Sequence, residues 1–309
     1  METSTPKVTI PKIVAPVVPV TLEPDEREPR LSVPHTSFSQ VSTYLRCSMQ
    51  YYYAYILKLR QRPSLAMSIG SGGHSALEYN GRHKIKTGED LAASDLLDMA
   101  STYIDHETEN LSPADLKPGE AIGDSKDRAI AAIRIYRVRD AEAIKPAGVE
   151  VEFNLDINTG EDEPVRVING KIDLITEDAG IEDYKFAGKM KSQSDVDVSP
   201  QLTLYGKVFR SLTGKYPSKV GLRIFTPGNT RASPDSRPLY RDDTMMTPAA
   251  QEAREARVTF QIRQAEKGIN AGFFIPADDP RTCSWCGYRD RCQSSLVTDF
   301  EAAKIRGEL

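Results

Sequence analysis

The placement of four cysteines limits the possible folds of this 309-residue chain more than any other sequence feature. Cys283, Cys286 and Cys292 form a C-x2-C-x5-C loop, whereas Cys47 lies 236 positions before Cys283. If all four bind one metal centre, the fold must close this long loop and join the two segments. The chain starts without a basic-then-apolar leader, so disulfides formed after secretion are not expected. The clustering therefore predicts metal ligation.

Two metal centres satisfy four thiolates, a [4Fe-4S] cluster and a tetrahedral Zn²⁺. Spacing alone does not separate them, but structural zinc more often uses two close pairs of ligands, so we favour iron–sulfur and keep zinc as the alternative. Four buried free thiols are a third interpretation. It is disfavoured because the loop cysteines have polar neighbours, namely Arg281, Tyr288, Arg289, Asp290 and Arg291.

Composition excludes few functions. Hydrophobic residues make up 39% of the chain, and no apolar run approaches the roughly 20 residues that cross a bilayer, so an integral membrane protein is not expected. The net charge of −4 gives no global attraction to nucleic acid but permits a local basic groove. We expect a soluble cytoplasmic protein.

Proline distribution divides the chain into a tail and a folded part. Residues 1–34 contain seven of the 20 prolines, spaced so that neither a helix nor a paired strand can persist. We predict an extended or disordered tail over 1–34, which could alternatively lie along the folded domain or a partner. A single folded domain is expected over 35–309.

Hydrophobic periodicity predicts an α/β fold whose first half is mainly helical. Ser37 or Ser39 can cap a helix that continues to Ile56, and helical periodicity returns at 67–79, 91–106 and 121–144. Short alternating runs then predict a β-meander with strands at 149–155, 165–175 and 181–186. The remaining predictions are a helix at 201–212 opened by Ser199-Pro200, strands at 220–226 and 238–241, and a helix at 248–270.

Three charged residues of the meander suggest hydrolytic chemistry. Asp183 and Lys185 share one face of a strand because side chains alternate, and a hairpin turn at 177–180 would bring Asp173 beside Asp183. Two carboxylates can hold Mg²⁺ or Mn²⁺ for phosphodiester hydrolysis, while an ammonium orients the attacking water. The alternative is a solvated hairpin face with a surface salt bridge, which is the more common fate of a D-x-K spacing.

Two further features support a site at the meander. His74 follows Gly70-Ser71-Gly72-Gly73, small residues that permit a close backbone approach, so its imidazole is a candidate metal ligand. Gln201 and Tyr205 lie one turn apart near a helix N-terminus, a place suited to a phosphate or to the surroundings of the carboxylates. A structural histidine and an ordinary amphipathic helix are the alternatives.

Together these motifs resemble the RecB-like branch of the PD-(D/E)XK nuclease superfamily, in particular the iron–sulfur exonucleases typified by the CRISPR-associated RecB-like proteins and the AddB nuclease domain. The resemblance covers most of residues 37–295. Its motifs are Ser-Phe-Ser-Gln-Val-Ser-Thr-Tyr-Leu-Arg-Cys from Ser37, Gly-Gly-His74, Gly170-Lys-Ile-Asp173, Glu182-Asp-Tyr-Lys185, Gln201-x3-Tyr205 and C-x2-C-x5-C. Each motif is weak alone, and their order and spacing are specific jointly.

The resemblance implies a restriction-endonuclease-like fold, with a mixed β-sheet flanked by helices and an iron–sulfur cluster joining the N- and C-terminal segments. It also implies roles for individual residues. The catalytic cation, Mg²⁺ or Mn²⁺, would be bound by His74, Asp173, Asp183 and the Tyr184 carbonyl. Lys185 would be the catalytic lysine, Gln201 and Tyr205 would support the site and the DNA, and Cys47, Cys283, Cys286 and Cys292 would hold [4Fe-4S].

Two positions depart from the pattern or leave it ambiguous. Ile172 stands where the superfamily name has proline, a position without a direct chemical role. Glu182 adjoins Asp183, and alternation with Lys185 favours Asp183 as the acidic residue.

The implied function is a metal-dependent DNA exonuclease that acts on single strands or duplex ends, in recombination, repair or CRISPR adaptation of a bacterial or phage-infected cell. A recombination, helicase or CRISPR protein is the expected partner, because no P-loop motif is present. One alternative is a catalytically idle iron–sulfur DNA-binding subunit, and another is a redox sensor. The tyrosines near Cys47 could stack on unpaired bases, but we expect most of them to pack in the core.

Overall fold

The computed structural model describes residues 36–59, 64–157, 167–226 and 233–294. These residues divide into two compact units. The first unit consists of residues 64–153, 171–226 and 233–258, and the second of 36–59, 154–157, 167–170 and 259–294. The tail predicted at 1–34 lies outside the described residues. The single domain predicted over 35–309 stays a prediction.

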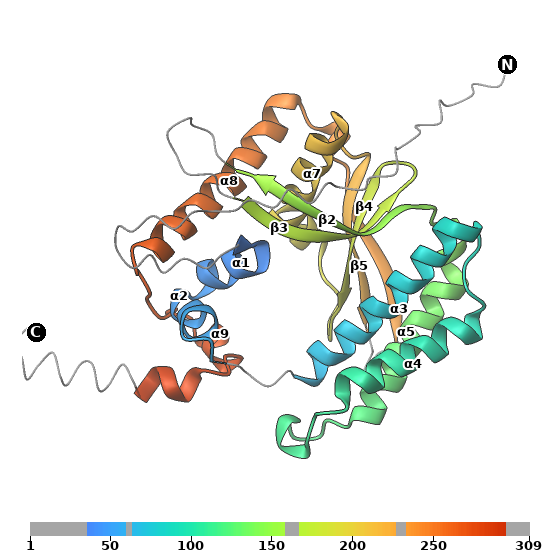
Figure 1. Ribbon diagram of the computed structural model, residues 1–309, viewed down its shortest axis with the longest axis horizontal. Coiled ribbons are helices and arrows are strands. Elements are labelled where there is room, and N and C mark those ends of the chain that lie inside the picture. Colours follow the sequence, from blue (N-terminus) through green and yellow to red (C-terminus); the bar gives the residue numbers. More distant parts are fainter. Residues whose placement is uncertain (1–35, 60–63, 158–166, 227–232, 295–309) are drawn as a thin grey trace, which may run out of the picture. The chain divides into compact units, whose positions relative to one another are not determined.

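A mixed β-sheet forms the framework of the fold (Figure 1). Its strand order is β1-β3-β4-β5-β6, and β2 also pairs with β3. The β3–β4 and β5–β6 pairs are antiparallel, while β1–β3 and β4–β5 are parallel, which confirms the mixed sheet. The strands are β1 (Thr36–Ser37), β2 (Pro146–Asp156), β3 (Val167–Thr176), β4 (Gly180–Phe186), β5 (Lys219–Thr226) and β6 (Asp235–Arg241).

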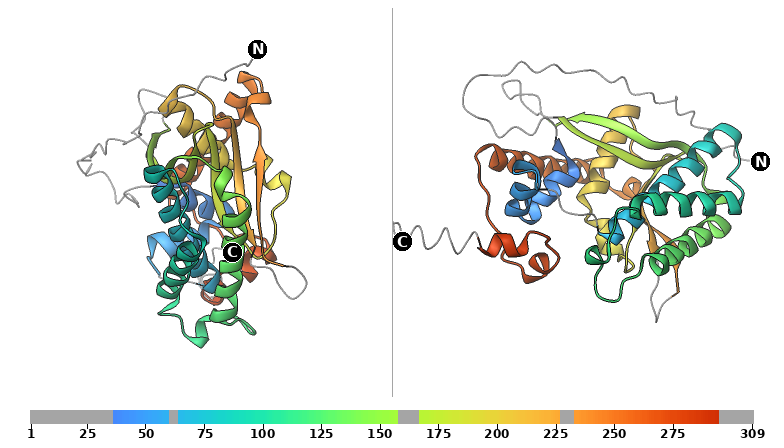
Figure 2. Two further views of the ribbon diagram at one scale, coloured as in Figure 1. Left: turned by 90° about the vertical axis from the view of Figure 1, so that its right-hand side faces the viewer. Right: turned by 60° about the horizontal axis from the view of Figure 1, so that its bottom comes forward.

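Two helices of the first unit, α3 (Leu65–Thr87) and α5 (Ile122–Arg139), contact one face of the sheet, and α4 (Ala93–Thr108) packs on both of them (Figures 1 and 2). Their apolar stripes pack on the sheet in one core, which contains Leu77, Leu96, Ile133, Leu174, Tyr184 and Phe225. α3 is longer than predicted because Ser64 caps its start and the left-handed Gly88 ends it. Short 3₁₀ turns follow α4 and α5, at Pro113–Asp115 (η2) and Ala141–Ala143 (η3).

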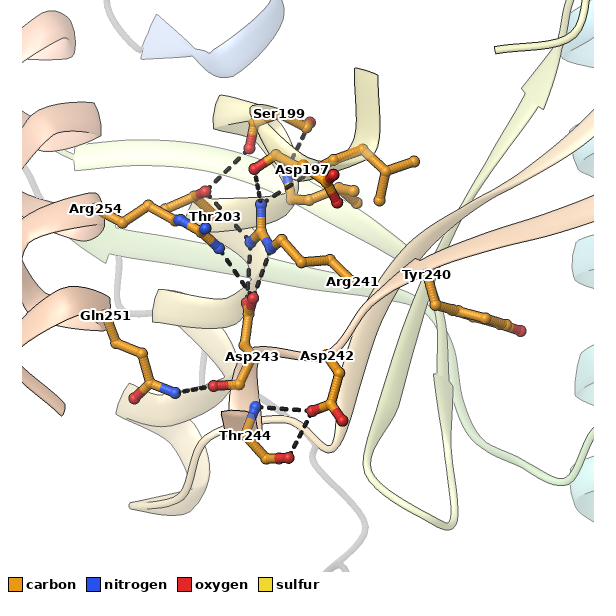
Figure 3. A network of polar contacts seen from close by, with 12 residues as sticks. Asp197, Ser199, Thr203, Tyr240, Arg241, Asp242, Asp243, Thr244, Gln251 and Arg254 are labelled. Carbon is orange, nitrogen blue, oxygen red and sulfur yellow. Dashed lines mark hydrogen bonds and ion pairs between the residues drawn. The ribbon is translucent and has the colours of Figure 1, made fainter. Parts of the chain in front are cut away.

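The other helices of the first unit are tied to the end of β6 by a polar network (Figure 3). They are α6 (Gln193–Asp197), α7 (Pro200–Thr213), a 3₁₀ turn at Asp243–Met245 (η4) and the start of α8 (Pro248–Asn270). Arg241 donates to both carboxylate oxygens of Asp243, at 2.6 and 2.9 Å, and to the Val196 and Asp197 carbonyls. Arg254 of α8 also donates to Asp243 at 3.0 Å. These hydrogen bonds give the guanidinium groups of Arg241 and Arg254 a structural role.

The second unit begins with α1 (Phe38–Arg46), α2 (Ser48–Tyr51) and a π-helical turn, η1 (Tyr52–Ile56), and also contains α9 (Pro280–Ser284). Ser37 caps α1 in a capping box with Gln40. The single helix predicted from Ser37 to Ile56 is wrong, because Cys47 adopts an extended conformation between α1 and α2. Its sulfur accepts the amides of Gln50 and Ala277, so a tertiary contact overrides local helix propensity.

Aromatic packing forms the core of the second unit. Tyr51 stacks on Phe274 with ring centroids 6.4 Å apart, and Tyr53 lies 5.5 Å from Tyr288. Tyr51, Tyr53 and Tyr288 are buried. Within the described residues, no helix is both long enough and apolar enough to cross a bilayer.

A buried ion pair joins β4 to β5 on the face covered by α5. Arg223 donates to both oxygens of Glu182, at 2.6 and 3.0 Å, and both residues are at most 3% exposed. The Tyr240 hydroxyl donates to Glu182 as well, Arg223 reaches Asp140 at 3.2 Å, and its guanidinium lies 5.4 Å from the Tyr136 ring centroid. All charges in this network are therefore compensated.

We predict that Arg223→Met destabilises the protein by about 3 to 5 kcal/mol, because it leaves the Glu182 carboxylate buried and unpaired. Urea unfolding followed by circular dichroism measures the loss. The double variant Glu182→Gln/Arg223→Met should recover part of it, since the unpaired charge is gone. A single variant as stable as the wild type contradicts this role of the pair.

Candidate metal centre and catalytic face

The two aspartates meet where β3 and β4 diverge. The paired residues at this end of the ladder are Leu174 and Glu182. Beyond them, Asp173 accepts the Tyr184 backbone amide through its side chain, with a distance of 2.6 Å from N to Oδ2. The hairpin therefore brings the Asp173 carboxylate next to Asp183 from the neighbouring strand. Both carboxylates are buried, and Asp183 is only 1% exposed.

Asp183 uses both carboxylate oxygens in contacts with neighbouring side chains. Its Oδ1 accepts Nε2 of Gln201 at 2.9 Å, and the same Gln201 nitrogen lies 2.9 Å from the Tyr205 hydroxyl. Its Oδ2 is buried and lies 2.6 Å from Nζ of Lys185, so the two groups form an ion pair. This pair holds the ammonium beside the two aspartates.

Strand alternation separates Asp183 from its acidic neighbour. Asp183 and Lys185 face α7, which contributes Gln201, whereas Glu182 faces the opposite side and pairs with Arg223. Glu182 is thus part of a buried ion pair on one face of β4, and Asp183 lies with Lys185 and Gln201 on the other. The assignment of Asp183 as the acidic site residue stays a prediction.

Two glycines bring His74 close to the carboxylates. A Cβ on Gly73 would lie 2.2 Å from the Phe186 ring, and one on Gly72 would lie 2.7 Å from Ile104, so neither position tolerates a side chain without movement. Helix α3 can therefore approach β4 and α4 closely. As a result, Nδ1 of His74 lies 3.6 Å from Oδ2 of Asp173, and the imidazole also bonds the Tyr184 backbone.

Glu150 is the residue that the sequence analysis missed. Among the described residues, the one group with three potential ligand atoms within 4.8 Å of one another is His74, Glu150 and Asp173. Glu150 has a φ of 48°, a left-handed conformation that is uncommon outside glycine. In a regular strand Val149 and Phe153 would face the same side of the sheet. Here Val149 packs with the α3–α5 core whereas Phe153 contacts Tyr205, so Glu150 interrupts the alternation of β2 as a β-bulge does.

Crowding of negative charge perturbs the ionisation of this group. Burial, and then the charge of Asp183, raise the pKa of Asp173 to about 7. Burial and Asp173 likewise raise the pKa of Glu150, while burial lowers the pKa of His74. Lys185 pairs with Asp183, and Lys171, which also acts on Glu150, is itself paired with Glu152, so an added cation would relieve the excess negative charge of the three carboxylates. An imidazole nitrogen and carboxylate oxygens also suit a divalent ion as ligands.

The four cysteines gather in the second unit. Burial and the charges of Cys47, Cys286 and Cys283 raise the pKa of the Cys292 thiol, so the other three cysteines lie within electrostatic range of Cys292. Cys47 accepts the Ala277 amide at 3.4 Å, and the Cys283 thiol donates to the Ala277 carbonyl at 3.8 Å. Ala277 thus links the segment of Cys47 to the loop that carries the other three.

The sequence model of the PD-(D/E)XK nuclease superfamily matches residues 35–293, and this chain belongs to that superfamily. A solved structure of a putative exonuclease from Eubacterium rectale shares its fold, with a TM-score of 0.52 and 13% identity over 83% of this chain and 87% of that one. The solved structure of SSO0001 is 15% identical over 69% of this chain and 92% of its own, with a TM-score of 0.32. No curated protein matches the sequence.

We predict that Asp173→Asn stabilises the metal-free protein at neutral pH. Between the unfolded pKa near 3.8 and the folded value near 7, the folded state holds a proton that the unfolded state has released, so stability falls as pH rises through this window. Removing the titrating group abolishes that loss, which is on the order of 1 to 4 kcal/mol at pH 8.

Thermal unfolding in the presence of a chelator, followed from pH 4 to pH 8, measures this effect. The difference in Tm between Asp173→Asn and the wild type should grow with pH and level off above about pH 7. Added Mn²⁺ should then raise the Tm of the wild type more than that of the variant. A difference in Tm that does not change with pH contradicts the raised pKa.

Proposed function

We propose that this protein is a divalent-metal-dependent deoxyribonuclease that acts as an exonuclease on single strands or duplex ends. The observation that carries the proposal is the convergence of His74, Glu150 and Asp173 beside the Asp183–Lys185 pair. Glu150, Asp173 and Asp183 crowd one another, and the ammonium paired with them is that of Lys185, so a divalent cation would neutralise the excess negative charge. Membership of a nuclease superfamily agrees with this chemistry.

The proposed cation is Mg²⁺ or Mn²⁺, held by His74, Asp173, Asp183 and the Tyr184 carbonyl, with Glu150 as an additional ligand. When bound, it supplies polarisation of the scissile phosphate and acidification of a water molecule. The proposed roles of the protein groups then follow from their contacts.

Lys185 can donate hydrogen bonds from its ammonium to the attacking water or to a phosphate oxygen, because its Nζ is already held beside Asp183. Gln201 donates to Oδ1 of Asp183 and so fixes the orientation of this carboxylate, which would hold the cation. Tyr205 in turn holds Gln201, and its pKa is raised by burial and by Asp183 and Asp173, so its hydroxyl stays neutral.

We also propose that Cys47, Cys283, Cys286 and Cys292 hold a [4Fe-4S] cluster. Sequence spacing favours the cluster, because structural zinc more often uses two close pairs of cysteines than one remote cysteine and a three-cysteine loop. Tetrahedral Zn²⁺ is the alternative. A role in recombination, repair or CRISPR adaptation, a helicase or CRISPR partner and a cytoplasmic location stay predictions.

We predict that Lys185→Ala lowers kcat for end-labelled DNA about 100- to 1,000-fold, because an oriented donor to the reacting phosphate is lost. The control is Lys215→Ala, an exposed lysine in the turn after α7, which should cleave at the wild-type rate. Gel analysis of single-stranded and duplex substrates with Mg²⁺ or Mn²⁺ reports activity, substrate preference and polarity. Undiminished cleavage by Lys185→Ala contradicts the assignment of this lysine.

Metal analysis tests the second centre. Protein purified without oxygen should contain about four iron atoms per chain and show the visible absorption of a cubane cluster. Cys286→Ser should lose iron and unfold at a lower temperature, since metal binding contributes folding free energy. Ser284→Ala, a change in the same loop, should keep both. Stoichiometric zinc would select the alternative metal, and a metal-free, equally stable protein would refute the centre.

A further inference from the structure

The only tryptophan of the chain lies exposed inside the cysteine loop. Trp285 stands between Cys283 and Cys286, and 77% of its surface is accessible. The tyrosines near Cys47 pack on one another and on Phe274, so their rings serve the core of the second unit. Within the cysteine loop, residues 283–292, the accessible aromatic surface is the indole of Trp285, because the ring of Tyr288 is buried.

Three exposed arginines, Arg281, Arg289 and Arg291, lie within six residues of Trp285. The same loop also carries Asp278, Asp279 and Asp290, so residues 278–292 have no net charge. The Asp279 carboxylate accepts the Arg281 and Thr282 amides at the start of α9. Residues 36–59 and 259–294 together contain seven lysines and arginines and four acidic residues, a net charge of +3 in a chain whose total is −4.

We propose that Trp285 and these arginines form a binding surface for unpaired bases of single-stranded DNA. A flat aromatic ring stacks on any base, and guanidinium groups beside it contact the phosphates that follow the base. The exposed arginines of the same loop can contact phosphates, which favours single-stranded DNA over a protein partner. The inference rests on the proposed nuclease function and specifies its substrate: a strand with unstacked bases.

Fluorescence anisotropy with labelled oligonucleotides tests the surface, with Lys185→Ala as the common background to prevent cleavage. Trp285→Ala should weaken binding of a short oligothymidylate about 5- to 150-fold, the loss of one stacked base, which is worth about 1 to 3 kcal/mol. Trp285→Phe should retain most of the affinity because it keeps a ring. The matched control is Phe260→Ala, which removes an aromatic side chain that is 61% exposed on α8.

A base-free phosphodiester strand of the same length separates stacking from charge attraction. Its affinity should not change in Trp285→Ala but should fall when Arg289 and Arg291 are both replaced by Ala. Iron and zinc contents measured on each variant show whether the cysteine loop is intact.

The proposed surface is wrong if Trp285→Ala, with an intact metal content, binds oligothymidylate as tightly as the Lys185→Ala background does. It is also wrong if Trp285→Ala weakens binding of the base-free strand by the same factor, or if Phe260→Ala weakens oligothymidylate binding by the same factor. The nuclease proposal is tested separately, by cleavage with the unmodified chain. Cleavage without any effect of Trp285→Ala would refute only the surface, and Trp285-dependent binding without cleavage would refute only the nuclease.

Discussion

Uncompensated negative charge in a buried place is the constraint on which the candidate site depends. Three carboxylates, those of Glu150, Asp173 and Asp183, meet close to one lysine, and burial makes each unpaired charge costly. The raised pKa of Asp173 expresses this cost in the metal-free protein. Such an arrangement can persist when a bound ligand neutralises the excess negative charge. The protein is then less stable without the cation, but it binds the cation more tightly.

Strand β4 carries two neighbouring buried carboxylates with different surroundings. Glu182 accepts two hydrogen bonds from Arg223 and one from Tyr240, so its charge is satisfied by the protein alone. Asp183, on the opposite face, is just as buried and is paired with Lys185 at 2.6 Å, but Asp173 lies within the influence of the same ammonium. Burial therefore does not distinguish the two residues. The balance of carboxylates and cations around each of them does.

Periodicity predicted the mixed α/β fold and most of its elements from the sequence, because their apolar stripes face a common core. It failed at residues whose backbone is set by tertiary contacts. Cys47 breaks the predicted first helix to bond Gln50 and Ala277. Strand β1 is two residues long and exists through pairing with Ile168 and Asn169, which no local pattern reports.

Glu150 shows the same limit within the candidate site. Regular alternation assigns it to the polar face of β2, and nothing in the sequence indicates a left-handed residue at this position. By contrast, the proximity of Asp173 to Asp183 and of Lys185 to both could be derived from the sequence, because a hairpin and period-2 alternation fix it. Residues positioned by a regular ladder are predictable, and those positioned by an irregularity are not.

The four cysteines and Trp285, the two candidate functional features of the second unit, are linked through the loop that carries them. Trp285 lies on a loop whose only regular elements are the five-residue helix α9 and the helical turn after Tyr288, too little secondary structure to fix an exposed indole. Cys283 and Cys286 flank it directly, so a metal centre bound by these cysteines would hold the loop at two points around the ring. Metal binding, and not DNA binding, would then offset the conformational entropy that the loop loses when it is ordered. Preorganisation of this kind makes a single exposed aromatic ring effective as a contact.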